Sequence, residues 1–319
     1  MVIVTGAAGF IGSRLVQSLS TTGDRVVSVD DLTAFDSRPE HAGIEFGERV
    51  APDALAGWLE QAAPPIAAIV HLGACTDTRE TDRTYLTRVN LQYSQQLWRY
   101  ASVAGLPLIY ASSAATYGDG SLGYDDDESL IPSLKPLNAY GDSKQQFDEW
   151  ALAQEHAGVH PPYWCGLKFF NVYGFGERHK GPMASVVLHA FDQIRATGRM
   201  RLFKSHRPDI ADGHQARDFV FVEDVVEVIR ALVTRPASRG IFNLGSGRAR
   251  TFLDLTRAVF AALDAPEQIE FIDTPADVRR HYQYFTEATM GRLQSAGYAQ
   301  HLTELEDGVR RYVGQLERT

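Results

Sequence analysis

The chain has 319 residues, of which 44% are apolar and 22% charged, and its formal net charge is -9. This length and composition suffice to bury the core of one large domain or of two coupled ones. The negative balance gives no electrostatic footprint for nucleic acid or for an anionic membrane surface, so local groups would have to hold any anionic ligand.

The number of cysteines and the length of the apolar runs indicate the cellular compartment. The chain has 2 cysteines, Cys75 and Cys165, which form neither a disulfide framework nor, alone, a four-ligand zinc site. No run approaches the roughly 20 apolar residues of a membrane helix, and strand-like sequence from Val2 leaves no room for a signal peptide. We therefore expect a cytoplasmic enzyme without nucleic-acid or membrane partners.

Apolar, often β-branched runs alternate with amphipathic stretches through the first two thirds of the chain. Residues 10–20 carry apolar side chains at helical spacing, and strands are expected at residues 2–4, 26–29, 68–70, 106–111 and 167–172. Such runs are typical of strands buried on both faces of a parallel sheet, with helices as crossovers. The pattern predicts the α/β class, in the form of a Rossmann doubly wound parallel sheet.

In the remainder of the chain, segments rich in Gly, Pro, Arg and His alternate with short apolar runs. One more strand is expected at 241–245 and a helix at 252–263. We predict a dinucleotide-binding domain over residues 1–174 and, over residues 175–319, mainly a smaller substrate-binding lobe, with segments around 217–245 returning to the first domain. The lobe would cover the C-terminal edge of the sheet, where open α/β sheets bind ligands.

An acidic run at residues 125–128 raises the question of a metal site. Carboxylates bind metal ions in principle, but no further cluster of ligand residues flanks this run. We therefore expect a solvated loop there and no metal site.

The strongest single motif is a glycine-rich turn between the first strand and the first helix. Gly6, Gly9 and Gly12 have the spacing G-x-x-G-x-x-G. Gly6 would allow the tight turn, Gly9 the close approach of a pyrophosphate, and Gly12 the packing of helix against strand. The helix N-terminus would add free N–H groups and a partial positive charge. A glycine-rich turn without a ligand is the alternative, which this context disfavours.

An acidic pair ends the second strand, about 20 residues after the glycines. Asp30 or Asp31 could accept hydrogen bonds from the adenosine ribose, and two acids would repel a 2′-phosphate, which favours NAD over NADP. In the alternative, Asp31 points to solvent and either Arg38 or Arg49 meets the phosphate of NADP. The sequence leaves both interpretations open.

Tyr140 and Lys144 have the Tyr-x-x-x-Lys spacing, which places both side chains on one face of a helix. A lysine cation nearby lowers the pKa of a phenol, so that Tyr140 can take a hydroxyl proton as a hydride leaves the same carbon. Lys144 can also bond the nicotinamide ribose. Ser113 follows the strand expected at 106–111 and could hold the substrate oxygen beside Tyr140. The alternative for Ser113 is a helix or turn cap.

Together the three glycines, Ser113, Tyr140 and Lys144 resemble the extended short-chain dehydrogenase/reductase family. Within that family, the chain is similar nearly end to end to the ADP-L-glycero-D-manno-heptose 6-epimerases. The most specific matches are His179-Lys180-Gly181 and residues 183–186, because general sugar epimerases lack them. Further matching segments are 73–75, 110–118, 136–138, 170–174, 217–220, 241–245, 282–283 and 285–286.

The resemblance implies isomerase chemistry on a small-molecule nucleotide sugar, in a homo-oligomer, toward bacterial lipopolysaccharide heptose. In that family, tightly bound NAD(P)+ removes hydride from C6″ of the heptose, and the ketone is reduced on its opposite face. Inversion requires an acid/base on each side of the carbon. The family's two groups correspond to Tyr140 and Lys180, and Lys144 and Ser113 complete the catalytic set. Without the family, Lys180 could equally bind phosphate or face solvent.

The resemblance also implies cofactor and substrate contacts at positions of this chain that match the family's motifs. Cofactor contacts correspond to Gly6, Gly9, Phe10, Ile11, Gly12, Asp30, Asp31, Leu72, Gly73, Ala74, Cys75, Thr76, Asn90, Tyr140 and Lys144. Substrate contacts correspond to Ser113, Asn171, Lys180, His189, Phe203, Lys204, Ser205, His206, Arg217 and Tyr282. Arg217 is the chemically obvious diphosphate clamp, since guanidinium binds phosphate oxygens in bidentate fashion. Without the family, His189 would be interpreted as a packing histidine.

Some positions depart from the family pattern, and they affect the expected choice between NAD and NADP. The family usually has Glu at the position of Leu72 and a neutral residue at that of Asp31. The basic residues that meet a 2′-phosphate in NADP-using members have no clear match between residues 31 and 50, and the segment 206–215 is longer than in many members. The resemblance implies one NADP per subunit, whereas the acidic pair favours NAD.

Three other functions are compatible with parts of this pattern. A UDP-hexose 4-epimerase shares the serine, tyrosine and lysine but would not need Lys180. A 4,6-dehydratase places Asp-Glu after the site hydroxyl to eliminate water, and this chain has Ala114-Ala115 there. A non-enzymatic NAD(P)-binding protein on the same fold commonly lacks the tyrosine, and fold alone does not establish function.

Overall fold

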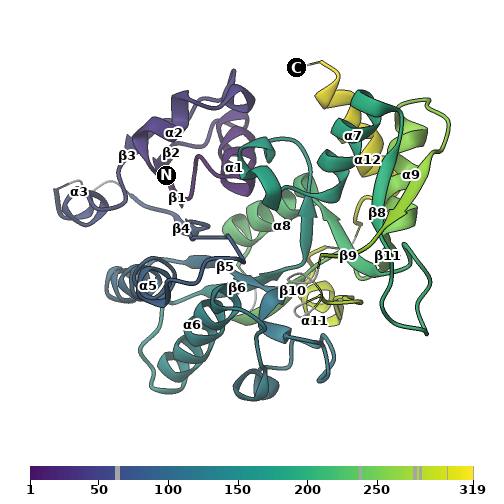
Figure 1. The fold of residues 1–319 in the computed structure, drawn as a ribbon. Coiled ribbons are helices and arrows are strands. Elements are labelled where there is room, and N and C mark those ends of the chain that lie inside the picture. Colours follow the sequence, from purple (N-terminus) through teal and green to yellow (C-terminus); the bar gives the residue numbers. More distant parts are fainter. Residues whose placement is uncertain (62–64, 237–238, 276–278, 280–281, 300, 319) are drawn as a thin grey trace.

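The computed structural model describes residues 1–61, 65–236, 239–275, 279, 282–299 and 301–318 (Figure 1). A seven-stranded parallel sheet lies at its centre, in the order β10-β6-β5-β4-β1-β2-β3. Its strands are β1 (Val2–Thr5), β2 (Val26–Val29), β3 (Glu48–Val50), β4 (Ala68–His71), β5 (Leu108–Ser113), β6 (Trp164–Phe169) and β10 (Gly240–Leu244). The α/β doubly wound class predicted from the alternating runs is confirmed.

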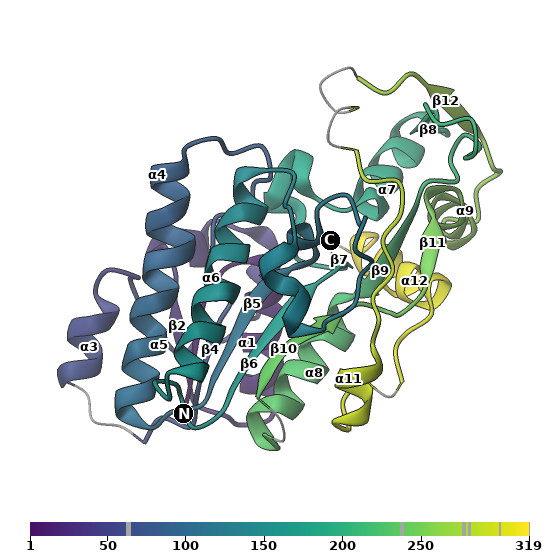
Figure 2. The same cartoon turned by 90° about the horizontal axis from the view of Figure 1, so that it is seen from below.

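Helices cover both faces of this sheet. In both views α5 and α6 lie on one face, and α1 and α8 lie on the other (Figures 1 and 2). The helices of this part are α1 (Phe10–Thr21), α2 (Leu32–Asp36), α3 (Leu55–Gln61), α4 (Arg83–Leu86), α5 (Tyr93–Ala104), α6 (Ala139–His156) and α8 (Val222–Thr234). Since the strands are buried on both faces, their apolar runs are nearly continuous, as the sequence pattern indicates.

The strand expected at residues 167–172 is two strands in the structure. β6 begins earlier, at Trp164, and ends at Phe169, while β7 (Asn171–Tyr173) pairs with β9 (Ala216–Phe221) of another sheet. Between them, the N–H of Phe170 donates to the carbonyl of Leu244, and the N–H of Val172 donates back to Phe170. The chain therefore turns out of the central sheet at Phe170, a bend that an unbroken apolar run conceals.

The second part of the molecule is built on two small sheets (Figure 2). One has the order β11-β9-β7, and the other pairs β12 with β8. α11 (Gly291–Ser295) packs against β10 of the central sheet, with Leu293 in the main core. The elements of the second part are α7 (Val186–Thr197), β8 (Met200–Phe203), β11 (Ala249–Thr251), α9 (Phe252–Ala262), β12 (Ile269–Ile272) and α12 (Leu305–Leu316). It has its own apolar cluster, distinct from the main core. The domain boundary expected at residue 174 stays a prediction.

The acidic run at 125–128 is solvated only in part: Asp125 and Asp127 are exposed, but the expectation of a solvated loop is wrong for Asp126 and Glu128. Asp126 is 2% exposed, and its carboxylate accepts the N–H of Asn243 at 2.9 Å. Glu128 accepts the N–H of Ile241 at 2.9 Å and pairs with Arg292 at 3.1 Å. β10 is an edge strand with unpaired N–H groups, so the carboxylates complete its hydrogen bonding. Within the described residues, no cluster of three metal-ligand side chains occurs.

No helix in the described part of the chain combines the length and the apolar character needed to cross a membrane.

An aromatic cluster fixes α5 and α6 on the sheet. Trp98 of α5 is 0% exposed, and its ring centroid lies 5.0 Å from that of Trp164 on β6 and 5.9 Å from that of Trp150 on α6. Its indole N–H donates to the carbonyl of Val159 at 3.0 Å. Three elements of the main core thus meet at one side chain.

Replacing Trp98 with Ala should lower the free energy of unfolding by about 3–5 kcal/mol, because it leaves a large cavity at this junction. Urea denaturation followed by circular dichroism measures the change. Val103→Ala on the same helix is the control, since Val103 is 91% exposed and its loss should change stability by no more than about 0.5 kcal/mol. Equal effects of the two substitutions would contradict this account of the core.

Candidate active site

The glycine-rich turn between β1 and α1 leaves no room for a side chain at Gly6 or Gly12. Gly6 has φ +68°, and a Cβ there would lie 2.6 Å from the N of Gly73, while a Cβ on Gly12 would lie 2.0 Å from the carbonyl oxygen of Gly6. Gly9 is the N-cap of α1 and makes no side-chain capping bond. The first turn of this helix therefore keeps N–H groups for a ligand, and the bare backbone cradle fits the pyrophosphate of a dinucleotide.

A cavity of about 1110 Å³ opens from this turn along the C-terminal ends of the strands. Pockets for small ligands commonly measure about 300–1,000 Å³, so this one is large enough for a cofactor and part of a substrate. Of the residues predicted from sequence, it is lined by Gly6, Gly9, Phe10, Ile11, Gly12, Asp30, Leu72, Gly73, Ala74, Cys75, Thr76, Ser113, Tyr140, Lys144 and Lys180.

At one end of the cavity, two charged side chains meet the backbone of Ala8. The carboxylate of Asp30 accepts the N–H of Ala8 at 2.9 Å and that of Asp31 at 2.8 Å. The guanidinium of Arg38 donates to the carbonyl of Ala8. Asp31 does not line the cavity: its side chain caps α2 by accepting the N–H of Thr33 at 2.9 Å, and this bond lowers the pKa of Asp31.

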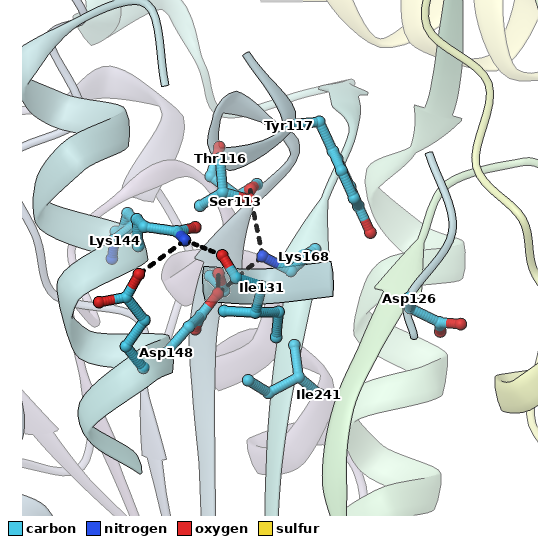
Figure 3. A network of polar contacts seen from close by, with 12 residues as sticks. Ser113, Thr116, Tyr117, Asp126, Ile131, Lys144, Asp148, Lys168 and Ile241 are labelled. Carbon is cyan, nitrogen blue, oxygen red and sulfur yellow. Dashed lines mark hydrogen bonds and ion pairs between the residues drawn. The ribbon is translucent and has the colours of Figure 1, made fainter. Parts of the chain in front are cut away.

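Tyr140, Lys144 and Ser113 come together where α6 passes the end of β5 (Figure 3 shows Ser113 and Lys144). Asn138 caps α6 by accepting the N–H of Gly141 at 2.8 Å, so Tyr140 lies in the first turn. The ammonium of Lys144 donates to the carbonyl of Ala111 at 2.9 Å. Burial lowers the pKa of Lys144 to about 8.

The group that lowers the pKa of Tyr140 is not the lysine expected from the sequence. Burial raises the pKa of Tyr140, and the hydrogen bond with Ser113, not Lys144, is the contact that lowers it. Ser113 also caps the short helix Ala114–Tyr117 by accepting the N–H of Ala115 at 3.1 Å, so the cap interpretation is confirmed and the role in holding a substrate oxygen stays a prediction.

Asn90 supports the site from behind rather than lining it. It lies on a π-helical turn, Thr87–Gln92, and is 1% exposed. Its side chain accepts the N–H of Cys75 at 2.8 Å and donates to the hydroxyl of Ser143 at 2.9 Å. Ser143 in turn donates to the carbonyl of Tyr140 at 2.7 Å, which joins the segment after β4 to α6. π-turns of this kind are frequent at functional sites.

Lys180 reaches the cavity from the short helix Arg178–Met183 after β7. Its ammonium lies 3.6 Å from the carboxylate of Glu177 and 5.1 Å from the ring centroid of Phe10. Glu177 is 0% exposed and accepts the N–H of Ser185 at 2.7 Å, which ties this loop to the start of α7. Lys180 is therefore held at the cavity wall and is not a solvent lysine.

The remaining predicted substrate contacts lie beyond the lining of this cavity. The guanidinium of Arg217 on β9 stands 5.4 Å from the ring centroid of Tyr282 and donates to the carbonyl of Gln283. The N–H of His206 donates to the hydroxyl of Tyr284, whose ring centroid lies 5.3 Å from that of Tyr282. Phe203 ends β8, Lys204 and Ser205 follow it, Asn171 begins β7 and His189 lies on α7.

A family model described as "NAD dependent epimerase/dehydratase family" matches residues 2–245. The chain belongs to the NAD-dependent epimerase/dehydratase family. A protein of Nitratidesulfovibrio vulgaris strain Hildenborough, named ADP-L-glycero-D-manno-heptose-6-epimerase, is 47% identical over 317 residues, which cover 98% of this chain and 97% of that protein. A protein of the same name from Fusobacterium nucleatum is 43% identical over 324 residues, covering 98% and 97%.

A solved structure agrees with these sequence matches. The crystal structure of Helicobacter pylori ADP-L-glycero-D-manno-heptose-6-epimerase matches with a TM-score of 0.80 and 26% identity, covering 100% of this chain and 96% of that one. This chain is therefore an epimerase-class enzyme of the NAD-dependent epimerase/dehydratase family, with an NAD(P) cofactor.

Sequence reasoning missed part of the cavity wall of this family member. No motif in the sequence marks Asp53 or Tyr93, yet both line the cavity, together with Arg38, one of the two arginines that the sequence offers for a 2′-phosphate. Asp53 follows β3, a three-residue edge strand whose first two residues are exposed, so no apolar run marked it. An acidic residue just after a third strand was the available signal.

Replacing Gly12 with Ala should weaken cofactor binding at least about 10-fold, equivalent to about 1.4 kcal/mol, because the new Cβ displaces the phosphate turn. Fluorescence titration with NADPH and NADH measures it. Gly314→Ala on α12 is the matched control, because a Cβ there meets no heavy atom within 4 Å. Unchanged affinity in Gly12→Ala would refute the turn as the pyrophosphate cradle.

Proposed function

We propose that the chain is an ADP-L-glycero-D-manno-heptose 6-epimerase, which interconverts the D-glycero and L-glycero forms at C6″. The observation that carries the proposal is that Tyr140 and Lys180 line one cavity from separate elements, α6 and the loop after β7. Inversion needs a proton-transferring group on each face of a carbon. Curated relatives at 40–47% identity over nearly the whole chain bear this name, which supports the assignment.

The cofactor would lie along the cavity, with its pyrophosphate on the turn of Gly6, Gly9 and Gly12 and its adenosine beside Asp30. When bound, it supplies reversible hydride transfer at C6″ and brings a positive charge into the cavity. Lys144 would orient the nicotinamide ribose. The residues named here would hold and orient the cofactor. Other residues would carry out the proton transfers.

Tyr140, hydrogen-bonded to Ser113, takes the proton of the C6″ hydroxyl as that carbon becomes a ketone. Ser113 holds the same oxygen. After the ketone presents its other face, Lys180 donates the proton that restores the hydroxyl, and the reverse direction exchanges the roles. A group on one wall cannot serve both faces, so a single acid/base would not suffice. Arg217, Tyr282 and the residues 203–206 would hold the ADP moiety.

Replacing Tyr140 with Phe should lower kcat by about 100- to 10,000-fold, the usual contribution of a positioned acid/base. Lys180→Met should lower it comparably, because one face loses its proton donor. Proton NMR of the purified protein with ADP-D-glycero-D-manno-heptose, without added cofactor, follows the appearance of the L-glycero epimer. Lys135→Met is the control, since Lys135 is exposed and lies outside the cavity lining.

The outcomes separate the candidate reactions. No epimer from the wild-type protein, even with added NAD+ or NADP+, would reject the heptose assignment, and UDP- and dTDP-hexoses would be tested next. Turnover of a UDP-hexose with Lys180→Met fully active would instead identify a 4-epimerase. Full activity of Tyr140→Phe would reject Tyr140 as the base.

Of the two cofactors, we propose NADP. Asp31 turns away to cap α2, and both oxygens of Asp30 already accept backbone N–H groups. Arg38 lies at the same point of the cavity wall, against Ala8, where an arginine can pair with a 2′-phosphate. Arg49, the other basic candidate, pairs with Asp36 at 2.8 Å and does not line the cavity.

Arg38→Ala should raise the dissociation constant of NADPH about 10- to 100-fold, the loss expected for hydrogen bonds to a charged group. The affinity for NADH should change little. Arg49→Ala serves as the control and should alter neither affinity, and fluorescence titration measures all of them. If Arg38→Ala weakened both cofactors equally, Arg38 would not discriminate between them.

The product would be a precursor of bacterial lipopolysaccharide heptose. The cytoplasmic location and the homo-oligomeric state expected from the sequence analysis stay predictions.

A further inference from the structure

A buried ion pair lies behind the catalytic residues, outside the cavity lining. Lys168 on β6 and Asp148 on α6 approach to 2.8 Å, with side chains that are 1% and 0% exposed. Asp148 also accepts the hydroxyls of Tyr110 at 3.0 Å and Ser112 at 2.7 Å, both from β5. One carboxylate thus joins α6, β5 and β6 beneath the site (Figure 3).

The hydroxyl of Thr116 connects this ion pair to Ser113. Lys168 donates to the Oγ1 of Thr116 at 2.6 Å, and Thr116 donates to the carbonyl of Ser113 at 2.8 Å. In Figure 3, Thr116 and Ser113 lie directly beyond the end of Lys168. Asp148 follows Tyr140 and Lys144 at intervals of four residues, which places all three on one face of α6.

Stability alone does not account for this arrangement. Removing two charges from water costs free energy that their attraction barely offsets, and apolar residues of similar volume often serve as well. Apolar residues would not form directional hydrogen bonds. Here a chain of hydrogen bonds fixes the main chain of Ser113 relative to the helix that carries Tyr140. A displacement of about 1 Å at a reacting group can lower turnover about 100-fold.

We propose that Thr116, Lys168 and Asp148 form a positioning unit for the catalytic centre, holding Ser113 at the distance from Tyr140 that proton transfer requires. None of the three touches the cavity, and each acts through Ser113 or α6. The inference rests on the proposed epimerase reaction for its kinetic readout only.

The carboxylate also bears on the charge of Lys144. Burial lowers the pKa of Lys144 to about 8, and Asp148 and Cys75 raise it. His71 faces Lys144 from β4 and stays neutral, because burial lowers its pKa to about 3. Tyr140 lies one turn before it on α6. Lys144 loses its cation as pH rises through its pKa, so removing the charge of Asp148 moves that loss to lower pH.

The first test removes the hydroxyl of Thr116 while leaving the ion pair in place. Thr116→Val should lower kcat about 10- to 100-fold with KM nearly unchanged, and Thr116→Ser, which keeps the hydroxyl, should retain activity. Thr256→Val is the matched control, because Thr256 is equally buried and its hydroxyl makes no hydrogen bond within the described structure. Full activity of Thr116→Val, or equal loss in both serine and valine variants, would overturn the proposal.

A second readout does not depend on the reaction. Hydrogen exchange followed by mass spectrometry should show faster exchange over residues 113–118 in Thr116→Val than in the wild type and in Thr256→Val. If the wild type fails to epimerise the heptose, the proposed function fails, and this exchange still decides the positioning unit. Unchanged exchange with unchanged melting temperature would refute it.

Asp148→Asn gives the third measurement. The alkaline limb of the pH profile of kcat should move to lower pH, since the pKa of Lys144 loses the carboxylate that raises it. A purely structural role of Asp148 would lower the melting temperature and the active fraction but leave the limb in place, and that result would contradict the proposal.

Discussion

The close approach of three backbone segments is the constraint on which the rest of this structure depends. Where β1 ends, the chain must pass within contact distance of the segment after β4 and return under the first turn of α1, and only glycine at Gly6 and Gly12 permits this. This packing exposes the helix N-terminus to the cavity. It also aligns the end of β4, which carries Gly73 to Thr76, beside the ends of β1 and β2.

The residues that we propose for the reaction come from elements later in the chain. α6 supplies Tyr140 and Lys144, β5 supplies Ser113, and the loop after β7 supplies Lys180. Two buried networks hold these pieces: one runs through Asn90 to the main chain of Tyr140, and the other through Lys168 to that of Ser113. Each network reaches the site through a main-chain carbonyl, that of Tyr140 or that of Ser113.

The sequence predicts what depends on local pattern and spacing, and it fails where distant segments decide. The strands with continuous apolar runs, the glycine turn and the single helical face of Tyr140 and Lys144 follow from residues close in the chain. The bend at Phe170 depends on Leu244, and the burial of Asp126 depends on an edge strand far along the chain. The capping role of Asp31 is local, through the N–H of Thr33, and the sequence left it open. The sequence offers Arg38 and Arg49 as alternatives for a 2′-phosphate, and it does not show that only Arg38 meets Ala8 and lines the cavity.

The carboxylates along β10 have a consequence for the behaviour of the protein at high concentration. An edge strand with free N–H groups is a template on which another chain can add a strand, the first step toward cross-β aggregates. Here Asp126 and Glu128 already accept the N–H groups of Asn243 and Ile241, and Arg292 covers the same edge. The run that resembles a metal site in the sequence thus closes the sheet against unwanted self-association.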